Sequence, residues 1–241
     1  MTLPVFDPVP RAILFDLDDT LCDYSAARAM RLRVAFALDG DGQPAARAKE
    51  LLDEMVAASI AMHPHGTDHF PDLFHQYGIG DREAAARAAA WYRRNRFHGL
   101  ELFAGSLDAL RAVRSARSLP GLTRQVGIIT NGPTEVQRAK ISLLGLEDFV
   151  DFVLISEEFG AAKPDPSIYH AAVARLGAGH DEVVFVGDTA EFDMAGAHAA
   201  GLRSVWINAN ANDWPGPGRA PDQTVAHIMD VPHLVDSAFL S

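Results

Sequence analysis

Short apolar runs alternate with amphipathic segments along most of the chain. The runs have the length of buried strands and lie at Ala12–Leu17, Gln125–Ile129, Phe152–Ile155, Val183–Val186 and Ser204–Ile207. Segments with helical spacing separate the later runs, at Thr134–Leu144, Pro166–Leu176 and Phe192–Ala200. Strands that alternate with helices of this length indicate a parallel sheet with right-handed crossovers. The pattern therefore predicts an α/β fold with a doubly wound parallel sheet.

The region after the first strand has a different pattern. Its stretches are amphipathic and rich in Ala and Arg, with no convincing strand, at about Ser25–Leu38, Ala45–Ala61 and Arg82–Phe97. The simplest organisation is an α/β core of residues 1–21 and 99–241, interrupted by a helical insert at 22–98. Residues 98–105 would be the return hinge. Near the end, a loop at Asn208–Asp222 precedes a short strand, Thr224–Ile228, and a terminal helix.

Composition and charge narrow the class of protein. The chain has 241 residues, 48% of them hydrophobic and 22% charged, which are ordinary globular proportions. A net charge of −11 argues against a nucleic-acid polymer as partner, because phosphate backbones require a basic face. The single cysteine, Cys22, excludes disulfides within the chain and thiolate zinc clusters. With no secretory signal and no apolar stretch of membrane-spanning length, we expect a cytoplasmic monomer or homodimer.

Polar residues gather where the predicted strands end. The first strand ends at Asp16 and Asp18, and the second at Thr130 and Asn131, and three more polar residues belong to the later strand ends and the loops beside them, namely Lys163, Asp188 and Asp193. In a parallel sheet the carboxyl ends of all strands share one edge, where ligands bind. These side chains are therefore expected to converge.

That set of residues suits one chemistry. Clustered carboxylates repel one another unless a hard divalent cation lies among them, and oxygen ligands favour Mg²⁺. A lysine and a hydroxyl supply donors for a phosphoryl group. The Asp16 carboxylate can then attack phosphorus and form an aspartyl-phosphate. Asp18 can protonate the leaving alkoxide and later deprotonate the hydrolytic water.

Four segments, FDLDDTL, IITNG, AKPDP and VGDTAEFD, resemble the four motifs of the haloacid dehalogenase superfamily, in order and at strand ends. The resemblance covers about Ala12 to Ile228. The long gap between the first two motifs resembles members that carry a helical cap. A Rossmann-like core with a cap that selects the substrate is therefore what the resemblance implies.

The resemblance also implies roles for individual residues. Asp16 is expected to be the nucleophile and Asp18 the general acid/base. Mg²⁺ would be held by the Asp16 side chain, the Asp18 backbone carbonyl and Asp188. The phosphoryl group would be held by Thr130, Lys163 and the backbone N–H groups of Leu17, Asp18 and Asn131. Asp193 would be a supporting acid that ligates through water or positions Lys163.

The first motif separates reaction classes within the superfamily. Dehalogenase members lack an acid at the position of Asp18, because a departing halide needs no proton, whereas an alkoxide does. The second and third motifs resemble pyrimidine 5′-nucleotidases, and the fourth resembles N-acylneuraminate-9-phosphatases at least as well. We therefore expect a phosphoric monoester hydrolase for small metabolites, a nucleoside 5′-monophosphate or a sugar phosphate.

Two other functions remain open. A phosphomutase would begin with the same attack by Asp16, although DDT here replaces the DGV or DGT of sugar-phosphate mutases. A non-catalytic regulatory protein on this fold would usually lose an acid from the first or fourth motif. Several residues have simpler interpretations than a role in the site. The histidines His63, His65, His69 and His75 would form a polar loop, and Cys22 would fill a small apolar space. Arg28, Arg31 and Arg33 would form a solvated face of the first helix in the insert.

We expect deletion of the predicted cap, residues 22–98, to relax specificity, because closure of a cap excludes water and large substrates. The measurement is phosphate release from small and bulky esters by the deletion variant and the full chain. A folded variant with unchanged selectivity would show that substrate choice lies in the core.

Overall fold

The computed structural model describes residues 6–7, 9–38, 45–62, 66–115, 123–216 and 218–235. The chain forms two compact units. The core unit contains Met1–Asp23 and Leu102–Ser241, and the helical unit contains Tyr24–Glu101. The helical unit thus begins and ends two or three residues later than the predicted insert, 22–98.

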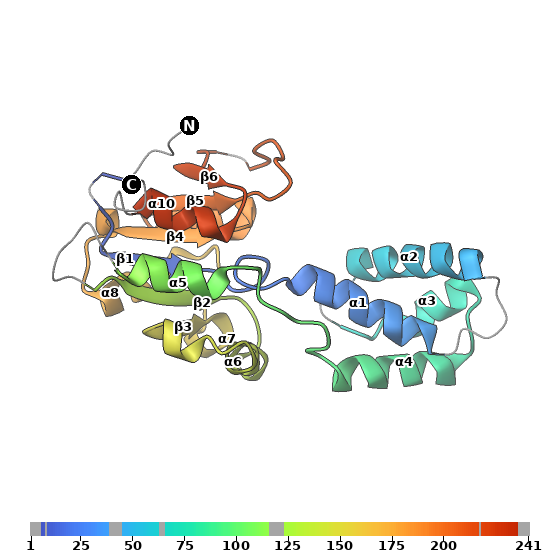
Figure 1. The fold of residues 1–241 in the computed structure, drawn as a ribbon. Helices are drawn as coiled ribbons and strands as arrows, with labels where there is room; N and C mark the ends of the chain where they lie inside the picture. Colours follow the sequence, from blue (N-terminus) through green and yellow to red (C-terminus); the bar gives the residue numbers. More distant parts are fainter. Residues whose placement is uncertain are drawn as a thin grey trace. The chain divides into compact units, whose positions relative to one another are not determined.

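The core unit is built on a parallel sheet (Figure 1). Its strand order is β3-β2-β1-β4-β5-β6, and each neighbouring pair is parallel. The strands are β1 (Ala12–Phe15), β2 (Gln125–Thr130), β3 (Phe152–Ile155), β4 (Val183–Gly187), β5 (Arg203–Ile207) and β6 (Gln223–Val225). The chain first adds strands on one side of β1 and then on the other. This reversal between β1 and β4 is where open α/β sheets bind ligands, and it confirms the predicted doubly wound fold.

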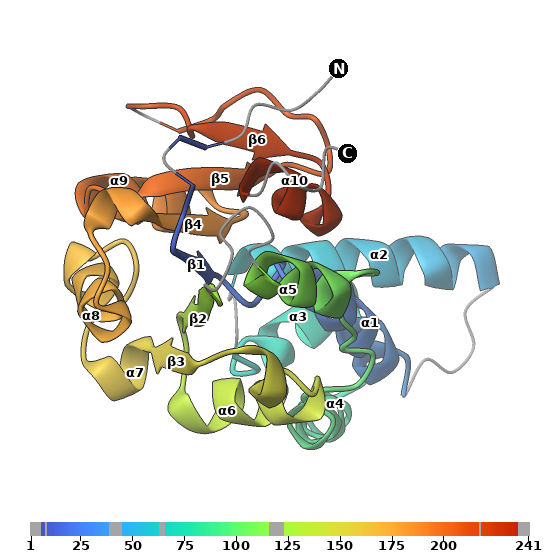
Figure 2. The same cartoon turned by 60° about the vertical axis from the view of Figure 1, so that its left-hand side comes forward.

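Helices cover both faces of the sheet (Figure 2). α5 (Ser106–Ser115) packs with α10 (Val231–Val235) on one face, and α8 (Pro166–Leu176) packs with α9 (Ala195–Ala199) on the other. The remaining core-unit helices are α6 (Thr134–Leu143), α7 (Ser156–Phe159) and the short turns η1 (Glu147–Phe149), η2 (His180–Glu182), η3 (Ala190–Met194) and η4 (Ile228–Asp230). Because both faces are covered, the central strands read as continuous apolar runs.

The core unit differs from the predicted elements at several places, including the unpredicted short helix α7 and β6, which ends three residues before the predicted strand Thr224–Ile228. The hydrophobic pattern predicted no helix at α5, although its buried residues Ala109, Leu110 and Val113 have helical spacing. The single helix predicted at Phe192–Ala200 is divided into the π-helical turn η3 and α9. The hydroxyl of Tyr169, in α8, donates to the carbonyl oxygens of Phe192 and Asp193 at 2.9 and 3.3 Å. A side chain from another helix therefore bonds carbonyls of η3, which local spacing cannot reveal.

The helical unit has its own apolar core. It consists of α1 (Tyr24–Ala37), α2 (Ala45–Met62), α3 (Phe70–Tyr77) and α4 (Arg82–Arg94). Phe36 packs edge-to-face against Phe70 and Phe74, with ring centroids 4.9 and 5.8 Å apart. α3 was not among the predicted helices. Among the described residues, no helix is both long and apolar enough to cross a membrane.

The polar residues of this unit correct two simpler interpretations. Arg31 is only 4% exposed and lies over the rings of Tyr24 and Tyr92, so the solvated arginine face predicted for α1 is wrong there. Arg28 is also buried, whereas Arg33 is exposed and pairs with Asp53. The predicted polar histidine loop is likewise only partly correct. His69 is buried with its Nε2 2.7 Å from Ser59 Oγ, His75 is exposed, and His63 and His65 lie outside the described residues.

We expect Arg124→Met to lower the free energy of unfolding. Arg124 is fully buried and its guanidinium donates to the carbonyl oxygens of Pro10, Val113 and Val235, which join the entry to β1 with α5 and α10. Leaving buried acceptors without donors costs about 1–3 kcal/mol each. Urea denaturation followed by circular dichroism measures the loss. Arg111→Met, which removes an exposed arginine, is the control, and equal losses for both would contradict this role.

Candidate active site

The loop after β1 brings several polar groups to the carboxyl edge of the sheet. The backbone N–H groups of Leu21 and Cys22 both donate to the carbonyl oxygen of Leu17, so the chain curls tightly here. Asp19 has a φ of 59°, in the left-handed region that aspartate tolerates better than most residues. The loop carries Asp18 and Thr20 next to Asp16, which directly follows the strand.

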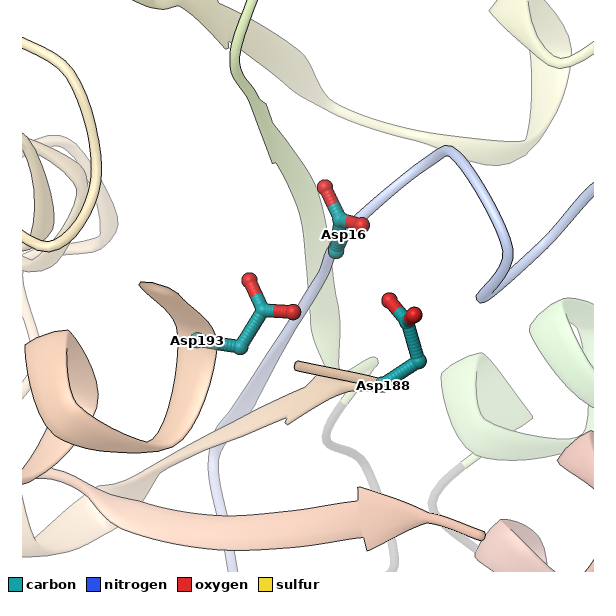
Figure 3. Close-up of side chains that lie close together, drawn as sticks. All are labelled: Asp16, Asp188 and Asp193. Carbon is teal, nitrogen blue, oxygen red and sulfur yellow. The ribbon is translucent and has the colours of Figure 1, made fainter. Parts of the chain in front are cut away.

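Three predicted acids meet at this edge. Asp16 follows β1, Asp188 follows β4, and Asp193 lies in η3. One carboxylate oxygen from each lies within 4.8 Å of the others, and Figure 3 shows the three side chains grouped at the strand ends. Asp16 and Asp193 are buried, at 6% and 1% exposure, and Asp188 is partly buried. Asp16 and two acids far from it in sequence, Asp188 and Asp193, thus form one cluster that could hold a metal ion.

Lys163 joins two of these acids. Its Nζ lies 2.6 Å from Asp16 Oδ1 and 2.6 Å from Asp193 Oδ1, and its side chain is only 4% exposed. The Asn131 side chain brackets the Lys163 backbone, accepting from its N–H at 2.9 Å and donating to its carbonyl at 3.0 Å. The Asn131 amide thus positions Lys163, a contact that the sequence motifs did not reveal.

The hydrogen bonds distinguish the three acids from one another. Both oxygens of Asp193 are engaged, Oδ1 by Lys163 and Oδ2 by the N–H and hydroxyl of Thr189. Asp16 accepts through Oδ1, and Asp188 accepts through Oδ1 from the Thr20 hydroxyl at 3.1 Å. Within the described part of the chain, Oδ2 of both Asp16 and Asp188 carries no hydrogen bond. Those two oxygens are the ones best able to ligate a cation.

Gly187 allows Asp193 to approach the end of β4. A Cβ at position 187 would lie 2.6 Å from both Cβ and Cγ of Asp193, closer than atoms in proteins pack. The indole of Trp206, in β5, donates at 2.7 Å to the carbonyl oxygen of Asp188, the next residue. At the end of β4, the Trp206 indole therefore holds the backbone of Asp188, and the lack of a side chain at Gly187 leaves room for Asp193.

Burial dominates the electrostatics of the acids. It raises the pKa of Asp16 to about 7, since the Lys163 ammonium offsets only part of the effect of burial and of Asp193. Burial, followed by the charges of Asp16, Asp193 and Asp19, raises the pKa of Asp188 to about 8. Burial alone would lower the pKa of Lys163, but the carboxylates of Asp16 and Asp193 hold that pKa above its ordinary value. Lys163 therefore remains an ammonium, but its single positive charge is too little to keep all the neighbouring acids ionised.

Two residues of α6, Gln137 and Lys140, also belong to the site and were not predicted. Lys140 Nζ lies 2.8 and 2.6 Å from the two carboxylate oxygens of Asp18. Gln137 Nε2 lies 2.5 Å from Thr130 Oγ1, which is therefore engaged within the site. The available signal was their spacing, because Gln137, Lys140 and Ile141 form the buried face of α6. Polar residues at such positions indicate buried partners.

The charges of the site favour a divalent cation. Four carboxylates, of Asp16, Asp18, Asp188 and Asp193, face two ammonium groups, of Lys140 and Lys163, which leaves an excess of two negative charges. Buried carboxylates in excess must take up protons or bind a cation. The donors are oxygens alone, the set that hard cations prefer. These residues therefore fit a metal ion of the Mg²⁺ type.

An acid-rich centre with a buried lysine, at the ligand-binding edge of a doubly wound sheet, is typical of an α/β enzyme. A model of the haloacid dehalogenase-like hydrolases matches residues 10–201. The chain therefore belongs to that family, as its four motifs predicted. Members of this family generally use a metal ion, in agreement with the acidic cluster.

The curated relatives include phosphatases of both kinds that the motifs resemble, and others such as the phosphoserine phosphatase of Thermus thermophilus, 29% identical over 92% of this chain and 97% of that protein. The pyrimidine 5′-nucleotidase YjjG of Escherichia coli (strain K12) is 36% identical over 132 residues, about half of each protein (54% of this chain and 55% of the relative). The N-acylneuraminate-9-phosphatase of Homo sapiens is 28% identical over 240 residues, 94% of each protein. These relatives support the predicted class, a phosphoric monoester hydrolase.

A solved structure supports the fold. The HAD-hydrolase YfnB of Bacillus subtilis, in a magnesium-bound form, aligns with a TM-score of 0.68 and 22% identity, over 94% of this chain and 98% of that one. The alignment includes nearly all of both chains, and it confirms the α/β architecture.

We expect the metal-free protein to lose stability as the pH rises from about 4 to about 8. In this window the folded protein keeps protons on Asp16 and Asp188 that the unfolded chain, with a carboxyl pKa of 3.8, releases. Mg²⁺ competes with those protons, so its stabilising effect should be larger at pH 8.5 than at pH 6.

Thermal unfolding in EDTA and in Mg²⁺ across this pH range measures both effects. Asp188→Asn is the control and should show a weaker pH dependence in EDTA and a smaller shift with Mg²⁺. A Mg²⁺ shift that is independent of pH, or equal in the variant, would contradict the assignment of the metal site.

Proposed function

We propose that this protein is a Mg²⁺-dependent phosphatase that hydrolyses phosphomonoesters of small metabolites through an aspartyl-phosphate on Asp16. The observation that carries the proposal is the Asp16 carboxylate, which is buried, held at Oδ1 by Lys163 and within 4.8 Å of a carboxylate oxygen of Asp188. A buried carboxylate in this setting is oriented as a nucleophile. The Lys163 ammonium beside it supplies positive charge that an incoming phosphate requires.

In the first half of the reaction, a carboxylate oxygen of Asp16 attacks the phosphorus of the ester. The bond between phosphorus and the ester oxygen breaks, and Asp18 gives its proton to that departing oxygen. Lys163, together with the Thr130 hydroxyl and nearby backbone N–H groups, would neutralise the charge on the transferring group. Asn131 contributes by fixing the backbone of Lys163.

In the second half, water attacks the aspartyl-phosphate. Asp18, now a carboxylate, accepts a proton from the water, and the bond between phosphorus and Asp16 breaks to release inorganic phosphate. Asp16 and Asp188 would hold the Mg²⁺ through their side chains and Asp18 through its backbone carbonyl, with Asp193 supporting Lys163. When bound, Mg²⁺ would offset the excess negative charge and polarise a phosphoryl oxygen.

We assign the choice of substrate to the helical unit, Tyr24–Glu101, which has a separate apolar core and interrupts the chain between Asp16 and the rest of the site. The relatives act on a pyrimidine 5′-nucleotide and on an N-acylneuraminate 9-phosphate. For this chain we propose a small phosphate ester of one of these types, a nucleoside 5′-monophosphate or a sugar phosphate.

We expect the protein to release phosphate from at least one member of a panel of nucleoside 5′-monophosphates, sugar phosphates, phosphoglycolate and a sialic acid 9-phosphate. Release should require Mg²⁺ and stop in EDTA. Asp16→Asn keeps the shape of the nucleophile without its charge and should lower kcat by at least about 10³-fold, as removal of a nucleophile does elsewhere.

The matched control is Asp151→Asn, a partly exposed acid paired with Arg114 at the start of β3. It should leave kcat unchanged. Transfer of the phosphoryl group to a second sugar hydroxyl, without free phosphate, would identify a phosphomutase. No turnover of any ester by a folded, Mg²⁺-binding protein would favour a regulatory protein and contradict the proposal.

A further inference from the structure

Lys140 is a buried cation whose role the four motifs do not explain. It is 3% exposed and lies on the same face of α6 as Gln137, three residues earlier, which is 1% exposed. A buried ammonium is costly unless it is paired. Its partner is Asp18, which is 122 residues away in sequence.

The contact holds the whole carboxylate. Lys140 Nζ lies 2.8 Å from Oδ1 and 2.6 Å from Oδ2 of Asp18, and Gln137 Nε2 lies 3.1 Å from the same Oδ2. Rotation of a carboxylate about its last torsion is otherwise broad, and donors to both oxygens restrict it. The Asp18 side chain keeps 24% of its surface exposed, so the group is oriented and still accessible.

Gln137 connects Asp18 with Thr130 and Asn131, the polar residues of the second motif. The same amide nitrogen that approaches Asp18 lies 2.5 Å from Thr130 Oγ1 and 3.1 Å from the carbonyl oxygen of Asn131. One face of α6 therefore connects the expected acid/base with the end of β2. The two lysines divide the acids between them, because Lys163 holds Asp16 and Asp193 while Lys140 holds Asp18.

We propose that Lys140 is a positioning residue that orients Asp18 for both proton transfers of the reaction. This inference rests on the proposed phosphatase activity. When Asp18 gives its proton to the ester oxygen, negative charge develops on Asp18. The Lys140 ammonium, which is already next to it, stabilises that charge. When the aspartyl-phosphate is hydrolysed, the same carboxylate is held in place to take a proton from water. Lys140 acts through Asp18 and not on the substrate.

The test compares leaving groups in Lys140→Met. An alkyl phosphate needs a proton on its leaving oxygen, so its kcat/KM should fall by about 10²-fold, the size of a misplaced catalytic group. p-Nitrophenyl phosphate releases a stable anion without a proton, so its kcat/KM should change by less than about 3-fold. Its kcat and KM should fall together, because hydrolysis of the aspartyl-phosphate still needs Asp18. A burst of about one p-nitrophenolate per enzyme should precede the steady state.

A double-mutant cycle separates action through Asp18 from a general effect on the fold. In the Asp18→Asn background, Lys140→Met should change kcat/KM for the alkyl ester by less than about 2-fold, since residues that act as a unit are not additive. Lys140→Arg restores the cation and its donors and should recover most of the activity. Arg138→Met removes an exposed positive charge from the same helix and is the matched control, expected to behave as the unchanged protein.

Equal losses of kcat/KM for both leaving groups, or a full loss on top of Asp18→Asn, would overturn the inference. Lys140→Gln, which keeps a polar side chain, replaces the methionine variant if circular dichroism shows that the latter is unfolded. The failure of the proposed function looks different: the unchanged protein would then show no Mg²⁺-dependent phosphate release. An active protein in which Lys140→Met is silent would refute the role of Lys140 alone.

Discussion

The buried ion pairs of Lys163 are the interaction on which the rest of the site depends. The ammonium lies between Asp16, at the end of the central strand, and Asp193, in the π-helical turn after β4. These partners are 147 and 30 residues away in sequence, so the pairs connect three separate parts of the chain. If the lysine were removed, two buried carboxylates would face each other without compensation, an arrangement far less favourable than the pair.

The surrounding residues can be understood as support for that pairing. Asn131 holds the Lys163 backbone, Thr189 occupies the second oxygen of Asp193, and the missing side chain at Gly187 leaves room for Asp193. Among the described residues, the acidic oxygens of this cluster without a hydrogen bond are Oδ2 of Asp16 and Oδ2 of Asp188. The site thus holds the Lys163 ammonium in place for a phosphate and leaves an excess of negative charge where a cation would bind. This division is what electrostatic preorganisation requires.

The parallel sheet explains how a few residues, far apart in sequence, are enough to form the site. β1 and β4 are neighbours, and the chain continues from β1 to β2 and from β4 to β5, on opposite sides in the strand order, so their carboxyl ends meet at the reversal where such sheets bind ligands. Asp16 and Asp188 follow these two strands, and Thr130 ends the strand on the other side of β1. α6 adds a second layer, with Lys140 and Gln137 reaching the loop after β1. Asp16, the proposed nucleophile, and Asp18, the proposed acid/base, therefore have separate cationic partners from separate elements.

The sequence by itself determined three features, namely the buried runs that end in acids, the helical insert between the first two motifs, and the convergence of Asp16, Lys163, Asp188 and Asp193. It could do so because a buried parallel strand is continuously apolar and because all such strands end at one edge. Local spacing also located most of the longer helices, while α3, α5 and the short helix α7 were missed.

Only the tertiary structure decided which polar residues are buried and with what partners. Lys140 and Arg31 resemble surface residues of amphipathic helices, yet one pairs with Asp18 and the other lies against Tyr24 and Tyr92. The helix predicted at Phe192–Ala200 is likewise divided at a place where the hydroxyl of Tyr169, in α8, donates to the carbonyl oxygen of Phe192. The physical reason is that a side chain's charge and spacing record its chemistry, whereas its burial depends on groups brought to it from distant parts of the chain.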